Sequence, residues 1–370
     1  MTPLNNYFKY TLTPTTASAL MEIESARTVV EHTPLPLQVQ EELRRRARIR
    51  STHYSTRIEG NRLTLDEAEQ VIEGRHVSFH GRERDVSEVQ NYWNALLRVE
   101  EWAAKKKPLT EDLVKRLHAL VEHGMRARPS PYRDGQNVIR DSATGAIVYL
   151  PPEAKDVPEL MAALIKWVYQ AEKDGLPVPL ISALVHYQFV TIHPYYDGNG
   201  RTARLLATFI LHQGGYSLNG FFSLEEHHAR DLGAYYHALS VHPHHNYYEG
   251  RAEADLTGWV EYFTRILADV FTFAKEEALS RVGDEVQIEP EALRKLDPRQ
   301  RVVLSLFASR ERITATDVAR TLGLSQRMAR NLLKDWVTEG WLEIADPSKR
   351  GRSYILSVGY RVFNGNLTAI

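Results

Sequence analysis

The spacing of apolar residues predicts a mainly α-helical chain. Apolar side chains recur every three or four positions in one segment after another, as they do where one face of a helix packs on a core. Segment 39–58 is rich in Glu and Arg and free of proline, and it is expected to be helical too. The expected helices span 16–30, 39–58, 64–72, 88–105, 110–124, 157–169, 180–192, 200–213, 225–239 and 255–276.

One stretch before residue 280 has the pattern of strands instead. Val138-Ile139 and 146–150 are apolar runs on either side of a polar turn at 141–145, which predicts a β-hairpin. The exposed edge of such a hairpin offers unpaired backbone groups to another chain. By itself the hairpin is equally well interpreted as a surface decoration on a helical domain.

The last part of the chain has a different organisation. Residues 283–298 are acidic, contain proline and lack periodicity, which predicts a linker. Residues 299–370 then predict two helices around a glycine-containing turn and a hairpin, an order that resembles a winged helix. In that fold the second helix enters the major groove, and the basic residues that would face duplex DNA are Arg327, Arg330, Lys334 and Arg350. Winged helices also serve as protein-interaction modules, and this alternative stays open.

Composition excludes several classes of protein. The chain has 370 residues, with 46 Lys and Arg against 47 Asp and Glu, so no global charge favours nucleic acid. It has no cysteine, which excludes disulfides, thiolate zinc sites and a cysteine nucleophile. No apolar run is long enough to span a bilayer and no signal peptide pattern precedes residue 30, so we expect a cytoplasmic protein without a membrane partner. The histidines at 242, 244 and 245 do not have the spacing of a metal site and are expected on a surface loop.

The densest chemistry lies between the helices expected at 180–192 and 200–213. The sequence there is I-H-P-Y-Y-D-G-N-G-R-T-A-R, from Ile192 to Arg204. Free amides at the start of a helix bind phosphate, and glycines allow a close approach. A carboxylate such as Asp197 suits Mg²⁺ held together with phosphates, and His193 can accept a proton near neutral pH. The stretch therefore predicts a polyphosphate site with a base beside it.

The same stretch resembles the signature of the Fic family, H-x-F-x-[DE]-G-N-G-R-x-x-R, except that Tyr195 replaces phenylalanine. The resemblance covers roughly residues 40–275. It implies a protein adenylyltransferase that moves AMP from ATP to a Ser, Thr or Tyr hydroxyl of a target protein or of itself. It also implies a role for each residue of the motif: His193 as base, Asp197 as Mg²⁺ ligand, Gly198, Asn199 and Gly200 as anion hole, and Arg201 and Arg204 as phosphate clamps.

Three further sets of residues follow from this resemblance. Ser55 to Gly60 is similar to the Fic inhibitory motif, [ST]-x-x-x-E-[GN], which implies that Glu59 pairs with Arg204 and restrains the enzyme. By spacing alone, Ser55 and Glu59 fit a capped, exposed helix end better than an inhibitory motif. The hairpin residues Val138, Ile139, Ile147 and Val148 would hold the target by strand addition. Tyr235 and Tyr236 would lie beside the adenine, although tyrosine pairs on helices more often belong to a core.

These expectations divide the chain into an N-terminal arm (1–35), a Fic domain (36–282) with an inhibitory helix at 39–60, a linker (283–298) and a winged helix (299–370). Two alternative functions remain. One is a DNA-binding regulator whose Fic site senses nucleotide, and the other is an enzyme in which Glu59 activates water to remove AMP from a modified target. The identity of the target is not encoded in the motif. The sequence also leaves open whether inhibition acts within one chain or across a homo-oligomer.

Overall fold

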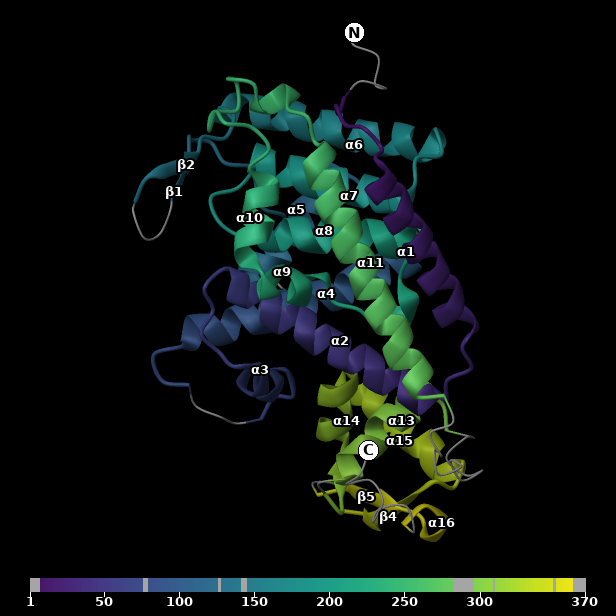
Figure 1. The fold of residues 1–370 in the computed structure, drawn as a ribbon. Helices are drawn as coiled ribbons and strands as arrows, with labels where there is room; N and C mark the ends of the chain where they lie inside the picture. Colours follow the sequence, from purple (N-terminus) through teal and green to yellow (C-terminus); the bar gives the residue numbers. More distant parts are fainter. Residues whose placement is uncertain are drawn as a thin grey trace. The chain divides into compact units, whose positions relative to one another are not determined.

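The structure is a computed structural model that describes residues 7–75, 79–125, 128–140, 145–282, 296–308, 310–348 and 351–361. The chain forms two compact units, residues 1–283 and 284–370. Most of the predicted linker, residues 283–295, lies outside the described residues. The mainly helical fold class is confirmed (Figure 1).

The first unit is a set of packed helices with one hairpin. Its helices are α1 (Pro14–His32), α2 (Leu37–Ile58), α3 (Leu65–Ile72), α4 (Glu83–Ala104), α5 (Glu111–His123), α6 (Val157–Lys173), α7 (Val178–Ile192), α8 (Asn199–Gln213), α9 (Leu224–Arg230), α10 (Leu232–Leu239) and α11 (Thr257–Ser280). The pair α7 and α8 lies at the centre, with α4, α5, α6 and α11 packed around it (Figure 1). Every residue of α7 from Pro179 to Phe189 is buried, so the loop after α7 starts from a rigid base.

Local signals explain where these helices begin and end. Thr64 caps α3 in a complete capping box with Glu67, and Thr110 caps α5 by accepting a hydrogen bond from the amide of Leu113. Gly124 has a φ of 80° and ends α5, a conformation that glycine adopts without strain. Short polar side chains and glycine therefore set the helix boundaries, as the sequence indicated.

One expected helix is wrong in its continuity. Residues 225–239 were predicted as a single helix, but the structure has α9 and α10 with a break at Asp231. The side chain of Asp231 accepts a hydrogen bond from the amide of Ala234 and so caps α10. A short acidic side chain that competes for the backbone ends the first helix and starts the second.

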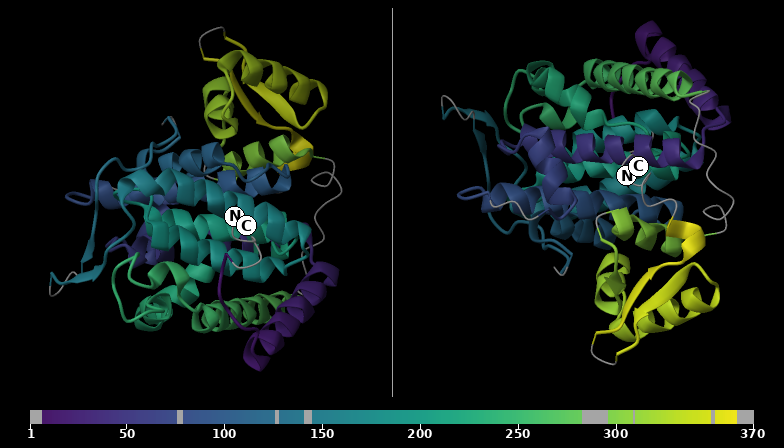
Figure 2. Two further views of the ribbon diagram at one scale, coloured as in Figure 1. Left: turned by 90° about the horizontal axis from the view of Figure 1, so that it is seen from above. Right: turned by 90° about the horizontal axis from the view of Figure 1, so that it is seen from below.

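The predicted hairpin is present. Strand β1 (Ile139–Arg140) pairs antiparallel with β2 (Ile147–Tyr149), and Ile139 lies opposite Tyr149. The hairpin projects away from the helices (Figures 1 and 2). Val138 lies just before β1 and not within a strand, so this part of the expected strand is shorter than predicted. Residues 141–144 of the turn lie outside the described residues.

The second unit has its own buried core. Its elements are α13 (Pro298–Leu304), η5 (Ser305–Ala308), β3 (Ile313–Thr314), α14 (Ala315–Leu322), α15 (Gln326–Thr338), β4 (Leu342–Asp346), β5 (Ser353–Leu356) and α16 (Val358–Arg361). The strand order is β3-β5-β4, and Trp336 and Trp341 anchor the core. Gly323, with a φ of 64°, makes the turn between α14 and α15. The elements occur in the order expected for a winged helix, and that assignment stays a prediction.

Candidate active site

The candidate base lies at the end of α7. His193 terminates the helix with a φ of 51°, a left-handed conformation that turns the chain into the loop. Its Nδ1 lies 3.2 Å from the carbonyl oxygen of Val190. Because a carbonyl can only accept, Nδ1 carries the proton and Nε2 keeps its lone pair. Burial lowers the pKa of His193 to about 4, so the ring is neutral at pH 7 and can accept a proton.

A buried aromatic stack supports the loop after the base. Tyr195 lies flat on His118 of α5, with 3.6 Å between the ring centroids and 14° between the planes. The aromatic anchor that the family signature requires is therefore kept. The buried hydroxyl of Tyr195, however, has no hydrogen-bond partner among the residues that the structure describes. His118 also donates from Nε2 to the carbonyl oxygen of Asp197, at 2.9 Å.

Asp197 offers the one open carboxylate of the loop. Its side chain is 61% exposed, and Oδ1 accepts the amide of Gly198 at 2.7 Å. Arg201 and Arg84 approach its two oxygens, each at 3.5 Å. A single exposed carboxylate beside helix amides fits Mg²⁺ that takes its other ligands from nucleotide phosphates and water. Within the described residues, no group of three or more His, Asp or Glu side chains is placed to hold a metal ion without such a nucleotide.

The amides of the glycine turn and Arg204 lie together at the start of α8, where Gly198 is the N-cap with a φ of 72°. Arg204 is buried, and its Nη2 lies 2.8 Å from Oε1 of Glu59. Its Nε donates to the hydroxyl of Ser55 at 2.8 Å, and Nη2 also donates to the carbonyl oxygen of Ser55 at 2.9 Å. A Cβ at Gly200 would overlap Glu59 Oε1, so this carboxylate covers the glycine turn. Glu59 and Arg204 are 145 positions apart in the sequence, and the fold brings them together as an ion pair.

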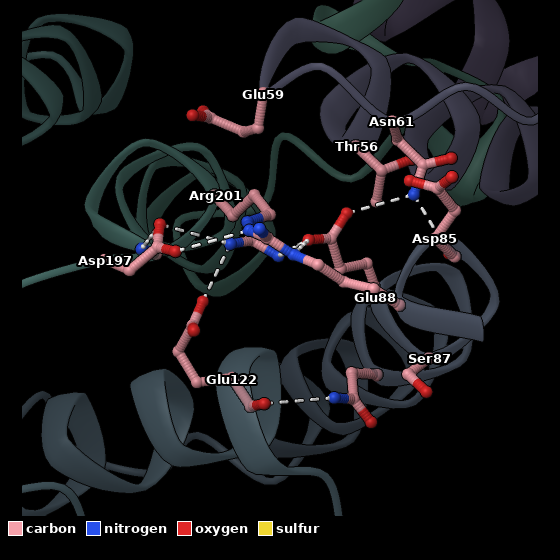
Figure 3. A network of polar contacts seen from close by, with 12 residues as sticks. Thr56, Glu59, Asn61, Asp85, Ser87, Glu88, Glu122, Asp197 and Arg201 are labelled. Carbon is pink, nitrogen blue, oxygen red and sulfur yellow. Dashed lines mark hydrogen bonds and ion pairs between the residues drawn. The ribbon is translucent and has the colours of Figure 1, made fainter. Parts of the chain in front are cut away.

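Arg201 points into a different set of partners. It is 2% exposed, and Nη2 lies 2.8 Å from Oε1 of Glu122 on α5. Glu88 of α4 lies 3.9 Å away on the other side of the guanidinium. Figure 3 shows Asp197, Glu122 and Glu88 pointing toward Arg201. The two arginines of the motif therefore belong to separate carboxylate networks.

Comparisons with known proteins agree with this geometry. Residues 108–211 match the model of the Fic/DOC family. A crystal structure of a Fic family protein from Desulfovibrio desulfuricans G20 is 27% identical and covers 95% of this chain and 98% of its own, with a TM-score of 0.59. Residues 108–211 therefore form a Fic/DOC family domain within the chain.

Two curated Fic proteins are similar over part of this chain. The protein adenylyltransferase Fic of Nematostella vectensis is 30% identical over 171 residues, which are 44% of this chain and 37% of that protein. The Drosophila melanogaster protein adenylyltransferase Fic is 25% identical over 257 residues, or 67% of this chain and 47% of its own length. The chain thus spans less than half the length of each of these two curated relatives.

The predicted tyrosine pair of the Fic domain splits into two environments. Tyr235 is buried, and its hydroxyl lies 2.9 Å from Nε2 of His186, which makes it a core residue at the back of the site. Tyr236 is 48% exposed, and burial followed by the charge of Glu59 raises the pKa of its hydroxyl. Of the pair, Tyr236 has the free surface that a nucleotide base requires.

The hairpin is tied to the base of the Fic site. The buried hydroxyl of Tyr149, the last residue of β2, donates to the carbonyl oxygen of Thr191, at 2.7 Å. Ile147 and Val148 are exposed, whereas Val138 and Ile139 are half-buried. This arrangement holds a strand edge beside the loop that carries His193.

Sequence reasoning missed the residues that support the Fic loop from outside. Arg133 donates from Nε to the carbonyl oxygen of His193 at 2.9 Å, and its amide bonds to Pro194. His118, Glu122 and Arg84 contact the loop from α5 and α4. No local pattern marks any of them, because the three helical residues have the spacing of ordinary amphipathic helices and Arg133 lies in the loop before β1.

The predicted DNA-binding residues and the histidines near 242 lie outside this site. Arg327, Arg330 and Lys334 are exposed on α15, opposite its buried residues, and Arg350 lies outside the described residues. His242 and His244 stack on one another in an exposed loop. In the described parts of the chain, no helix is both long and apolar enough to cross a bilayer.

Proposed function

We propose that the chain is a protein adenylyltransferase that moves AMP from ATP to a hydroxyl of a target protein. The observation that carries the proposal is the placement of one free imidazole nitrogen, an open carboxylate and a glycine turn at a helix start within one loop. A neutral base, a cation ligand and an anion hole are what nucleotidyl transfer requires.

The chemistry follows from these positions. Nε2 of His193 accepts the proton of the target hydroxyl, whose oxygen attacks the α-phosphorus of ATP. The bond from that phosphorus to the bridging oxygen breaks, and pyrophosphate leaves. The amides of Asn199 and Gly200 and the helix dipole stabilise charge on the phosphates, and the hairpin holds the target segment. Mg²⁺ bound at Asp197 would neutralise phosphate charge.

The resting state is restrained by Glu59. Its carboxylate pairs with Arg204 and covers Gly200, where the distal phosphates of ATP would lie. Burial by itself would lower the pKa of Arg204, but Glu59 outweighs this and the pKa is raised, so the arginine stays charged within the pair. A phosphate group must displace this carboxylate before Arg204 can bind it.

The test compares the wild-type chain, Glu59→Gly and Glu59→Gly/His193→Ala with ATP labelled at the α-phosphorus, in the presence of Mg²⁺. We expect protein-bound label to rise at least about tenfold in Glu59→Gly and to disappear without His193. Thermal unfolding of each variant serves as the folding control. No label in any folded variant that binds ATP would contradict the proposal and favour removal of AMP from a modified protein.

A second function is favoured by the charges of the C-terminal unit. Residues 296–361 contain 12 Lys and Arg against 7 Asp and Glu, although the whole chain is balanced. Three of these basic residues, Arg327, Arg330 and Lys334, lie on the exposed face of α15. We propose that this face binds the phosphates of duplex DNA.

The DNA proposal is tested with the full chain and a fluorescent duplex at two salt concentrations. We expect the affinity to fall steeply with salt, and to fall further when Arg327, Arg330 and Lys334 are changed to Gln. The exposed Lys105 in the first unit, changed to Gln, is the matched control. Binding that is insensitive both to salt and to the α15 substitutions would contradict it and favour a protein partner.

A further inference from the structure

Helix α5 contacts the catalytic loop through two residues on one of its faces. His118 and Glu122 are four positions apart and therefore neighbours along the helix surface. His118 stacks on Tyr195 and donates to the carbonyl of Asp197, whereas Glu122 bonds to Arg201. The loop is thus held from α5 both before and after its glycine turn.

The contact from Glu122 is close and largely shielded from solvent. Its Oε1 lies 2.8 Å from Nη2 of Arg201, and the two side chains are 17% and 2% exposed. A Cβ at Gly198 would overlap this same carboxylate, so Glu122 packs directly on the backbone of the turn. Position 198 needs glycine for this approach as well as for its φ of 72°.

Arg201 connects Glu122 to the open carboxylate. The nitrogen Nη2 that bonds to Glu122 also lies 3.5 Å from Oδ1 of Asp197 (Figure 3). Because Arg201 is almost fully buried, its guanidinium has no open face for a phosphate in this state. The resemblance implies that Arg201 binds phosphates, but in this state its guanidinium contacts Glu122 and Asp197.

We propose that Glu122 is a positioning residue of the site, which holds Arg201 so that the arginine orients the carboxylate of Asp197 toward a divalent cation. This inference rests on the proposed nucleotide and Mg²⁺ site. It adds that the negative charge of Glu122 offsets part of the positive charge of Arg201. Without Glu122, the arginine would turn fully onto Asp197 and compete with the cation for its oxygens.

The exposed Arg84 does not hold the carboxylate of Asp197 as Arg201 does. Its Nη2 lies 3.5 Å from Oδ2 of Asp197, but its side chain is 77% exposed and also bonds to Glu88. Such a surface pair is weak and a cation can displace it. The pair of Arg201 and Glu122 is much less exposed to solvent, at 2% and 17%.

The experiment is a double-mutant cycle in the Glu59→Gly background, in which the restraint on ATP is absent. Mn²⁺ is titrated into the complex with a non-hydrolysable ATP analogue and followed by electron paramagnetic resonance. We expect Glu122→Gln to weaken Mn²⁺ binding about tenfold when Arg201 is present, and less than about twofold when residue 201 is changed to Gln.

Each other outcome overturns the inference. Equal weakening in both backgrounds would show that Glu122 acts only as a nearby negative charge. Tighter binding of the ATP analogue by Glu122→Gln, with unchanged Mn²⁺ affinity, would show that Arg201 is a phosphate ligand that Glu122 restrains. Unchanged binding of both would give Glu122 a structural role alone.

Two further variants secure the result. Asp112→Asn removes a carboxylate from an exposed pair on the same helix and is expected to leave Mn²⁺ binding unchanged. Arg201→Met is similar in length and uncharged, so it replaces Arg201→Gln if that variant folds poorly and should likewise abolish most of the Glu122→Gln effect. Binding is measured without AMP transfer, so absence of transfer would count against the proposed function and not against this coupling.

Discussion

Glu59 and Arg204 form a 2.8 Å ion pair directly above the glycine turn at the start of α8. The arginine is fully enclosed and holds three bonds to one short segment of α2, at Ser55 and Glu59. A charge held this way cannot receive a phosphate without breaking several contacts at once. The pair therefore connects the end of α2 directly to the chemistry of the loop.

Ser55→Ala should weaken this restraint only in part. The substitution removes the bond from Arg204 Nε to the hydroxyl and leaves the bonds to Glu59 and to the backbone carbonyl of Ser55. One hydrogen bond of this kind contributes about 1 kcal/mol, so we expect AMP transfer to rise by about fivefold or less, below the rise in Glu59→Gly. Labelled-AMP incorporation measures it. Ser51→Ala, also buried on α2, should show no rise; an equal rise there would mean that any loosening of α2 releases the site.

Tyr195→Phe should preserve the site and stabilise the fold. The hydroxyl is buried and unpaired within the described structure, whereas the stack on His118 depends only on the ring. Removing an unpaired polar group should raise the free energy of unfolding by about 1 kcal/mol, measured by urea denaturation. Tyr132→Phe is the control, since that hydroxyl donates to Glu111 at 3.1 Å and its loss should cost stability. A decrease in the Tyr195 variant would reveal a partner for its hydroxyl.

The pH profile of transfer should reflect the lowered pKa of the candidate base. Burial lowers the pKa of His193 to about 4, so the neutral form that accepts a proton predominates at every pH above that value. For Glu59→Gly we expect kcat/KM to be flat from about pH 6 upward and to fall below about pH 5. The residual rate of the His193→Ala variant gives the baseline. A midpoint near 6.5, the ordinary value for histidine, would mean that the ring is solvated in the working enzyme.

Stability should fall in mild acid because several histidines are buried and neutral. Burial lowers the pKa of His118 and His212 to about 4 and that of His186 to about 3. The unfolded chain binds protons at these groups below about pH 6.5 while the folded chain does not, so stability decreases as the pH falls from 6.5 toward 4. Each such histidine contributes a slope of about 1.4 kcal/mol per pH unit.

Urea unfolding between pH 7.5 and 5 measures this slope. His212→Gln, a change remote from the loop, should make the slope shallower by about one histidine. His244→Gln, an exposed histidine, is the matched control and should leave it unchanged. A slope near zero over this range would show that the buried rings are protonated in the folded chain.

Local sequence was enough to predict most of the helices and the hairpin. Helix periodicity, capping residues such as Thr64 and the glycines of the turn act over a few positions, so their effects can be read directly from the order of residues. The single helix expected at 225–239 is wrong, and the cause is again a local one. Asp231 competes for the backbone there, and periodicity does not register that competition.

The sequence by itself determined that His193, Asp197 and the glycine turn share one loop between two helices, because neighbours in the chain stay neighbours in space. Only the tertiary structure decided how Arg201 and Arg204 are partnered. Glu122 and Glu59 lie 79 and 145 positions away from them, and both arrive through the packing of whole helices. Such pairings depend on which helix faces meet in the core, and periodicity alone gives the same pattern for many arrangements.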